Sequence, residues 1–376
     1  MKIVNAEAIF LRHPLSGEFR PTWGTGLVQT ELPMTLIKIE VEDGTLGYGA
    51  IPCNGKEGVI GFDTFIKPEL VGTDIFQTEK ISRLLRNASL RMTWPWGVEM
   101  AVWDAVGKIA KLPIHKMWGG EKSKIPVYAS LGENKPLDVR INEVKKLKSL
   151  GFAAVKLRFR NNQPKEDLKC VEMVRKELGD DFGIMVDANQ ADALPGSSEF
   201  FAWDYKLAYQ IGKELERYDV IWLEEPLSRF DYKGLQFLNE KLNLKLAGGE
   251  KNQMANEFKQ LIDDNCFDIL QGDSSFSEGM FQLRKIAAYA EINYKEFIPH
   301  TWSNCIGLNA NLQLAASLPN CSWFEFPYEE PGWNFEVSSY LLRNGHEIKD
   351  GFITVPQGHG LGMEFDTDRI EKYTVK

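Results

Sequence analysis

The sequence has few cysteines, and their arrangement suggests neither a disulfide framework nor a zinc site. Its 376 residues include five scattered thiols with no Cys-x-x-Cys pair, namely Cys53, Cys170, Cys266, Cys305 and Cys321. An odd number of dispersed cysteines is typical of a chain kept in a reducing compartment. The sequence therefore predicts a cytoplasmic protein.

Long apolar segments are also missing. A membrane-spanning helix needs roughly 18 or more consecutive apolar residues, and no run approaches that length. The apolar N-terminal residues are interrupted by Asn5, Glu7, Arg12 and His13, so they do not form a secretion signal. We expect neither a membrane span nor export.

Basic residues are outnumbered by acidic ones, 44 to 53, which gives a formal charge of -9. Such a field repels nucleic acid and anionic lipid, so neither is an expected partner. The content of 43% hydrophobic and 26% charged residues is that of an ordinary folded protein. The length of 376 residues fits a barrel of about 250 residues with a smaller second domain.

The first part of the chain, residues 1–122, reads as a small α+β domain. Alternation over Thr35–Val41 predicts a strand, and Glu42–Thr45 supplies a hairpin turn. Helical periodicity follows between Glu69 and Gly120, where Val98, Val102 and Val106 recur at helical spacing.

After Ser123 short apolar runs alternate with amphipathic segments, which is typical of successive βα units and a parallel sheet. Eight runs are predicted strands: 125–129, 153–159, 183–189, 220–224, 245–250, 268–272, 296–300 and 322–326. Eight strands with intervening helices favour a closed barrel over 123–349. Residues 350–376 are predicted to return to the first domain.

Nearly every predicted strand ends in a titratable residue: Lys156 and Arg158, Asp187, Glu224, Glu250, Asp273, His300 and Glu325. The interval from one to the next is about one βα unit. In a barrel these residues emerge together at the carboxyl-terminal rim, where such folds hold their active sites.

Asp187, Glu224 and Glu250 end three consecutive strands and have apolar or glycine neighbours. Three buried anions are costly unless a cation neutralises them, and an all-oxygen set suits Mg²⁺, with Mn²⁺ as a substitute. Individually, each carboxylate has the alternative of capping a helix or pairing with a basic residue. Glu225 competes with Glu224, because adjacent strand residues face opposite ways.

His300 ends a predicted strand, and Asp273 on the preceding one is placed to orient its imidazole, as a general acid or base requires. The alternative is a structural histidine, which is how we interpret His13, His115, His346 and His359, with His13 the most open to another role. Lys156 and Arg158 project to one face of their strand, toward the carboxylates or a substrate carboxylate. A solvated surface pair is the alternative.

Taken together, these motifs resemble the enolase superfamily, and within it the mandelate racemase group of the mandelate racemase and muconate lactonizing enzyme family. The resemblance covers essentially the whole chain. It rests on "DGTLGYGA", "VEMAVWDAVGKIAKLPIHKMWGG", "AAVKLRF", "VDANQ", "WLEEP", "GGE", "QGDSS", "PHTW" and "GHGLGM", in that order and spacing.

The resemblance implies a modified (β/α)8 TIM-type barrel of (β/α)7β order, with a capping domain that closes over the substrate. It implies one Mg²⁺ per subunit on Asp187, Glu224 and Glu250, a His300–Asp273 acid–base pair, and a protonated Glu325 that hydrogen-bonds an enolate. The shared step is removal of the proton α to a carboxylate, and relatives are usually homo-oligomers.

One departure matters for the reaction. Members of the family often carry Lys-x-Lys where this chain has Lys156 and Arg158, and arginine stays protonated at any working pH. A racemase needs a base on each face, so we favour dehydration of a sugar acid to a 2-keto-3-deoxy acid, with His300 as base and then acid. Proton removal by Lys156 or Arg158, with His300 only as acid, is the alternative scheme.

Other reactions stay open: a cycloisomerase or epimerase acting through the same enolate, or a metal-binding relative without catalysis. The loop 191–203 and the opening segment 15–31 are predicted specificity elements, and their polar, glycine-rich character suits a polyhydroxylated substrate. Four residues are assigned to substrate contact: Arg20 and Trp23 in the opening segment, and Asn189 and Trp302 within "VDANQ" and "PHTW".

Overall fold

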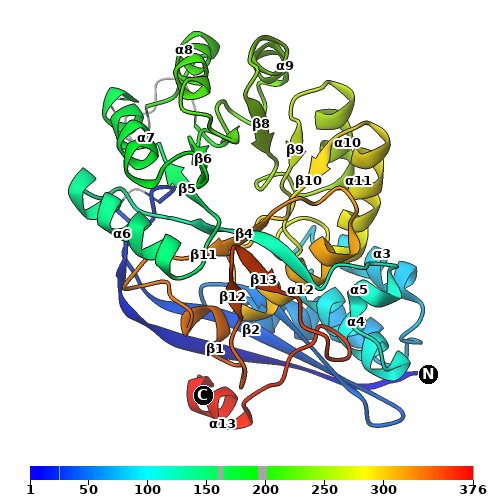
Figure 1. The fold of residues 1–376 in the computed structure, drawn as a ribbon. Coiled ribbons are helices and arrows are strands. Elements are labelled where there is room, and N and C mark those ends of the chain that lie inside the picture. Colours follow the sequence, from blue (N-terminus) through cyan, green and yellow to red (C-terminus); the bar gives the residue numbers. More distant parts are fainter. Residues whose placement is uncertain (25, 160–163, 194–200, 376) are drawn as a thin grey trace.

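The computed structural model describes residues 1–24, 26–159, 164–193 and 201–375. A small antiparallel sheet with its helices stands beside a larger ring of parallel strands surrounded by helices (Figure 1). Among the described residues, no helix is long and apolar enough to cross a membrane.

The small sheet consists of β1 (Ile3–Phe19), β2 (Gln29–Val41) and β3 (Leu46–Pro52), paired antiparallel in that order. The predicted hairpin is confirmed, because β2 ends at Val41 and β3 begins at Leu46. Gly44 in the turn has a φ of 82°, a conformation that favours glycine. Ile37 and Ile39 are fully buried, as their alternation predicts.

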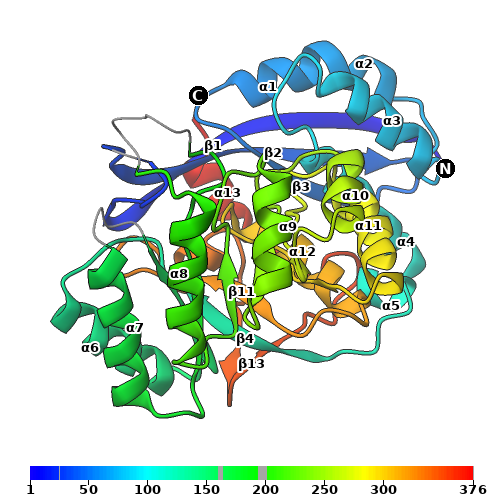
Figure 2. The ribbon, with the colours of Figure 1, turned by 90° about the horizontal axis from the view of Figure 1, so that it is seen from above.

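The helical segments of this first part follow β3 in sequence, and several of them pack against its sheet (Figure 2). They are α1 (Glu57–Gly61), η1 (Phe62–Ile66), α2 (Lys67–Leu70), α3 (Thr78–Ala88), α4 (Gly97–Ala110) and α5 (Ile114–Met117). The predicted stripe of Val98, Val102 and Val106 is buried on α4. Glycine permits the close contact with β3, since a Cβ added at Gly49 would meet the carbonyl oxygen of Gly97 at 1.8 Å.

All eight predicted barrel runs contain strands, and these lie parallel to one another. They are β4 (Lys124–Ser130), β5 (Ala154–Arg158), β6 (Gly183–Asp187), β7 (Trp222–Glu224), β8 (Lys245–Gly248), β9 (Ile269–Leu270), β10 (Glu296–Phe297) and β11 (Phe324–Pro327). Consecutive strands pair from β4 to β10, and β11 pairs with β4 from the other side. Between β10 and β11, both fully described, no ladder forms; instead Phe297 N donates to Asn320 O at 3.0 Å.

Helices alternate with these strands, which gives the expected (β/α)7β order in the described chain. They are α6 (Leu137–Ser149), α7 (Pro164–Leu178), α8 (Tyr205–Glu216), α9 (Tyr232–Lys241), α10 (Ala255–Asp263), α11 (Met280–Ile292) and α12 (Cys305–Ser317). Asp204 caps α8 by accepting a hydrogen bond from Leu207 N at 2.8 Å.

The C-terminal segment contacts both parts of the molecule. After η2 (Val337–Ser339) come β12 (Ile348–Lys349), β13 (Phe352–Thr354) and α13 (Thr367–Tyr373). Strand β13 pairs antiparallel with β4, whereas α13 lies against β1, where Val375 N donates to Phe10 O at 3.0 Å (Figure 1). The last residues therefore join the barrel to the small sheet.

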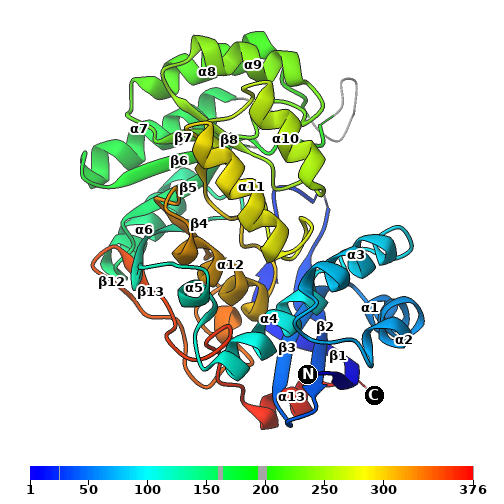
Figure 3. The same cartoon turned by 90° about the vertical axis from the view of Figure 1, so that its right-hand side faces the viewer.

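A buried carboxylate marks the contact between the capping helices and the barrel, where α4 packs against α11 and α12 (Figure 3). Glu99 on α4 is 3% exposed, and its Oε2 accepts a hydrogen bond from Phe281 N in the first turn of α11 at 3.1 Å. Burial, reinforced by nearby Glu278, raises the pKa of Glu99 to about 8.

This shift predicts a pH-dependent stability. Between the ordinary glutamate pKa of about 4.3 and about 8, native Glu99 holds a proton that the unfolded chain has released, so stability is lost as pH rises through that window. We expect Glu99→Gln to gain stability relative to wild type as pH rises from 5 to 8, measured by urea unfolding. Parallel stability curves for the two proteins would contradict this.

Candidate active site at the strand ends

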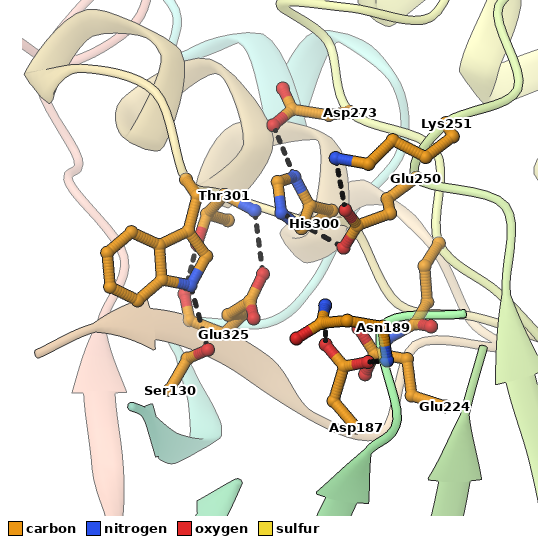
Figure 4. A network of polar contacts seen from close by, with 12 residues as sticks. Ser130, Asp187, Asn189, Glu224, Glu250, Lys251, Asp273, His300, Thr301 and Glu325 are labelled. Atoms are coloured by element: carbon orange, nitrogen blue, oxygen red, sulfur yellow. Dashed lines mark hydrogen bonds and ion pairs between the residues drawn. The ribbon is translucent and has the colours of Figure 1, made fainter. Parts of the chain in front are cut away.

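The strand-end residues predicted from the sequence lie together in the structure, and Figure 4 shows Asp187, Glu224, Glu250, Asp273, His300 and Glu325 among them. Lys156 and Arg158 come from β5, Asp187 and Glu224 end β6 and β7, and Glu325 lies on β11. Three more follow the ends of β8, β9 and β10 by two or three residues: Glu250, Asp273 and His300. All eight residues are buried. The barrel topology thus brings residues from seven strands to one rim.

Asp187, Glu224 and Glu250 form a cluster that fits a metal ion. Each offers a carboxylate oxygen, and the three oxygens lie within 4.8 Å of one another. Surrounding groups orient them: Asn189 Nδ2 donates to Asp187 Oδ2 at 3.0 Å, and Gln271 Nε2 donates to Glu224 Oε2 at 2.9 Å. A buried all-carboxylate set of this kind is typical of hard divalent cations.

Glu225 is buried beside the cluster as well. Strand β7 ends at Glu224, and the backbone at Glu225 has a φ of 44°, so the alternation assumed for a strand no longer applies. Burial raises the pKa of Glu225, and its Oε1 has no hydrogen-bond partner among the described residues. Of the two neighbours, Glu224 belongs to the triad. Glu225 is a further buried carboxyl group next to it in the chain.

Lys156 is held as a cation between carboxylates. It is fully buried, and its Nζ lies 2.7 Å from Glu224 Oε1, 2.7 Å from Glu325 Oε1 and 4.0 Å from Asp187 Oδ2. Burial lowers the pKa of Lys156, but the carboxylates of Glu224 and Glu325 outweigh it and raise the pKa above the ordinary lysine value. The surface-pair alternative is therefore wrong for Lys156.

Removal of this cation is expected to destabilise the fold strongly. Lys156→Met leaves Glu224 and Glu325 without their shared partner, and breaking a buried pair costs roughly 3–5 kcal/mol. Urea unfolding in the presence of EDTA measures the loss. The matched control is Lys245→Met, because Lys245 makes a half-exposed ion pair with Glu296 that is worth about 1 kcal/mol or less. Similar losses in both variants would contradict the prediction.

Arg158 is also fixed by its contacts. Its guanidinium pairs with Asp187, donates from Nε to Leu131 O, and donates from Nη2 to Ser130 Oγ at 3.2 Å. The group lies 5.1 Å from the centre of the Trp23 ring, a cation–π arrangement. Burial lowers the pKa of Arg158, but Asp187 and the neighbouring carboxylates outweigh it and raise it, so Arg158 is unsuited to accept a proton.

His300 bridges two carboxylates. Its Nδ1 lies 2.9 Å from Asp273 Oδ2 and its Nε2 lies 3.2 Å from Glu250 Oε2 (Figure 4). Burial lowers the pKa of His300, but Glu250, Glu325 and the hydrogen bond with Asp273 outweigh it and raise it to about 9. The Asp273 contact leaves Nε2 as the ring nitrogen directed at the triad.

Glu325 differs from the expectation in its charge. Its Oε2 accepts a hydrogen bond from Thr301 N at 2.8 Å, and its Oε1 pairs with Lys156. Burial alone raises the pKa of Glu325, but Lys156 and His300 outweigh it and lower the pKa. Lys156, which reaches Glu325 from β5, thus favours the charged form of this group, whereas its apolar sequence neighbours led us to expect a protonated acid.

A cavity of about 420 Å³ opens onto these groups. Arg158, Glu250 and His300 line it. Among the residues that the structure describes, its wall also carries the aromatic side chains of Phe19, Trp23, Trp94, Phe276, Trp302 and Trp333, and the polar residues Gln29, Asn54, Asp192, Arg229, Lys251, Gln253, Ser303 and Asn304. The mixture offers hydrogen-bonding groups beside apolar faces.

The four residues predicted to contact the substrate lie in different parts of the structure. Trp23 and Trp302 line the cavity, and Asn189 lies beside Asp187, where it also accepts a hydrogen bond from Thr22 Oγ1 at 3.2 Å. The Arg20 side chain is 61% exposed and pairs with Glu18. Of the predicted loop 191–203, residues 194–200 lie outside the described residues.

His13, the other histidine considered for function, is packed between aromatic rings. It stacks on Tyr340 at 4.3 Å and meets Tyr373 edge-on at 4.8 Å. Burial lowers its pKa to about 4. Its contacts are those of a structural residue that joins β1 to the C-terminal segment.

Sequence reasoning missed several residues of the site. Lys251 pairs with Glu250 Oε1 at 2.8 Å and lines the cavity, and its position directly after Glu250 was the available signal. Trp222 donates from Nε1 to Glu224 Oε2 at 3.1 Å, and alternation along β7 relates these two residues. Asn311 contacts Asp273 from within α12, where the sequence pattern carries no signal.

Two family models match most of the chain. The N-terminal domain of mandelate racemase and muconate lactonizing enzymes matches residues 20–119, and the enolase C-terminal domain-like model matches residues 140–369. The chain belongs to this family. The resemblance noted in the sequence is thereby confirmed, together with the mandelate racemase type of fold with its N-terminal capping domain.

Members of the family that resemble this chain span nearly its whole length. Arabinonate dehydratase from Saccharolobus solfataricus is 29% identical over 93% of each chain. The structure of L-talarate dehydratase from Polaromonas sp. JS666 complexed with Mg and L-glucarate is 25% identical, covers 100% of this chain and 98% of that one, and has a TM-score of 0.87. The 3,6-anhydro-D-galactonate cycloisomerase from Zobellia galactanivorans is 27% identical over 100% of each chain, with a TM-score of 0.83.

Proposed function

We propose that this protein is a Mg²⁺-dependent dehydratase that converts a sugar acid to a 2-keto-3-deoxy acid. The observation that carries the proposal is the combination of a buried carboxylate triad, a His300–Asp273 pair whose histidine lines the cavity, and two cations, Lys156 and Arg158, that are fixed by ion pairs. Relatives named as dehydratases of arabinonate and of talarate and galactarate support it.

Asp187, Glu224 and Glu250 are the residues proposed to hold the ion. The cluster fits a divalent cation because its three carboxylate oxygens converge. In addition, the buried carboxyl groups around it outnumber the basic side chains that pair with them. The carboxyl groups are those of Asp187, Glu224, Glu225, Glu250, Asp273 and Glu325, and the basic side chains are Lys156, Arg158, Lys251 and His300. When bound, Mg²⁺ acts as a Lewis acid that stabilises negative charge developing on a substrate carboxylate. Mn²⁺, which accepts the same ligands, is proposed as a substitute.

His300 is proposed to move the proton. In its neutral form Nε2 removes the proton from the carbon α to the carboxylate, while Asp273 holds the Nδ1 side of the ring. The imidazolium then returns this proton to the hydroxyl group on the β-carbon, which leaves as water. The enol that remains rearranges to the 2-keto-3-deoxy acid. Lys156 and Arg158 remain protonated and provide positive charge near the substrate carboxylate.

A second candidate function is supported by the likeness to the Zobellia cycloisomerase over the full length of both chains. In that reaction class the leaving oxygen stays within the molecule, so the product has the mass of the substrate. A screen of mono- and diacid sugars with Mg²⁺ separates the two functions: dehydration releases one water, whereas cycloisomerisation or epimerisation leaves the mass unchanged. If no sugar acid exchanges its α-proton with solvent, both candidate functions are contradicted, and the result favours the view that this protein binds a metal without catalysis.

Three further properties are proposed on narrower grounds. The five cysteines are free, which favours the reducing environment of the cytoplasm. We propose a division into residues 1–122, 123–349 and 350–376: the separate three-stranded sheet supports the first boundary, whereas β13 of the third part pairs with β4 of the second. A homo-oligomer is proposed from the family alone, and size-exclusion chromatography with light scattering tests it.

A further inference from the structure

Asn311 lies behind the Asp273–His300 pair and contacts both residues. It is fully buried on α12. Its Nδ2 donates to Asp273 Oδ1 at 3.0 Å and to His300 O at 2.8 Å, and its Oδ1 accepts a hydrogen bond from Ser274 N at 2.9 Å. One side chain therefore uses its amide nitrogen and oxygen on the two segments that carry the pair.

These contacts occur where the sheet no longer fixes the backbone. Strands β9 and β10 are two residues long and end at Leu270 and Phe297, each three residues before Asp273 or His300. The paired residues of these two strands end there. Beyond them, the side-chain amide of Asn311 connects the segment that carries Asp273 to the segment that carries His300.

The contacts also set the orientation of the Asp273 carboxylate. Oδ1 receives hydrogen bonds from Asn311 Nδ2 and from Ser275 N, the latter at 2.7 Å, which leaves Oδ2 directed at His300 Nδ1. A carboxylate held on both sides cannot rotate away from the imidazole. The imidazole in turn keeps its Nδ1 on Asp273 and its Nε2 toward the triad.

We propose that Asn311 is a positioning residue that holds the Asp273–His300 pair in the geometry for proton transfer. The inference rests on the proposed role of His300. Asn311 acts through Asp273 and through the backbone of His300, so its loss is expected to impair the chemical step rather than substrate binding. Misplacement of a catalytic group by about 1 Å costs roughly 100-fold in rate.

The same helix provides a matched control. Asn309 is also buried, but its Nδ2 donates to Cys305 O at 2.8 Å and lies 3.3 Å from His346 Nε2, away from the pair. Asn309→Leu and Asn311→Leu each replace a buried amide on α12 by an apolar side chain of similar size. General destabilisation of α12 therefore affects both variants, whereas disturbance of the pair affects only Asn311→Leu.

Two measurements test the proposal. With the sugar acid found in the screen, Asn311→Leu is expected to lower kcat by about 10- to 100-fold with KM unchanged, while Asn309→Leu keeps kcat close to wild type. Nitrogen NMR of histidine-labelled, metal-free protein, with His300 assigned from the His300→Asn spectrum, is expected to show an altered Nδ1–H signal only in Asn311→Leu. If that variant does not fold, Asn311→Ser, too short to bridge the two segments, takes its place.

Equal kcat losses in the two leucine variants, or a wild-type His300 signal in Asn311→Leu, would overturn the positioning role. The NMR measurement needs no substrate. An altered His300 signal in a protein that turns over no sugar acid would therefore reject the proposed function while supporting the role of Asn311.

Discussion

Replacement of His300 by Asn is expected to abolish exchange of the substrate α-proton with solvent and to lower kcat by about 100- to 10,000-fold. The reason is that His300 lines the cavity with its Nε2 directed at the triad, whereas Lys156 and Arg158 are held as cations by their ion pairs. Proton NMR of the sugar acid in deuterated water measures the exchange directly.

The matched control is His115→Asn. His115 is a buried histidine whose Nδ1 contacts Gln313 Oε1 at 2.7 Å on α12, outside the cavity. Its replacement is expected to leave exchange intact. Continued α-proton exchange in His300→Asn, with dehydration lost, would sink the single-histidine scheme, because another residue must then remove the proton and His300 serves only as the acid.

Glu250→Gln is expected to lower the affinity for Mg²⁺ at least about 100-fold. Loss of a hydrogen-bond partner around a metal site already costs about 10- to 100-fold, and this change removes a charged oxygen of the triad itself. Titration calorimetry measures the affinity, and thermal unfolding with and without Mg²⁺ measures the linked stabilisation. Mg²⁺ is expected to raise the unfolding temperature of the wild type and to leave the unfolding temperature of Glu250→Gln unchanged.

Glu99→Gln is the control for this experiment, because it replaces a buried carboxyl group that lies outside the triad. Its affinity for Mg²⁺ is expected to match wild type. A Glu250→Gln variant that binds Mg²⁺ as tightly as wild type would show that the ion lies elsewhere. In that case the protein would share the fold of the family but would not bind its metal ion at Asp187, Glu224 and Glu250.

The position of the site could be predicted from the sequence because barrel topology converts strand order into proximity. Asp187, Glu224 and Glu250 are separated by 37 and 26 residues, yet parallel strands with helical connections bring their ends to one rim. The titratable residues at the predicted strand ends were therefore sufficient to predict where the site lies in the barrel. The strand lengths were not predictable: β9 and β10 are two residues long, although their apolar runs extend further.

Charge states and supporting contacts depend on neighbours that the local sequence does not reveal. Glu325 lies in the apolar run "SWFEF" and was expected to be neutral, but Lys156 reaches it from β5. Asn311 lies in a helix that is buried along almost its whole length, so no amphipathic pattern distinguishes the face that meets Asp273. Such residues become visible only when segments distant in sequence are placed in contact.

The pairing of β4 has a consequence for synthesis of the chain. This first barrel strand receives partners from β5, which follows soon after it, but also from β11 and β13, which are made only after the intervening βα units. Leu11 of strand β1 likewise meets its partner Thr374 only after the whole barrel has been made. At about 5–20 residues per second, β4 waits roughly 10 seconds or longer for β11. One edge of β4 therefore stays without its native partner while the intervening βα units are made, an interval in which a chaperone can cover that edge.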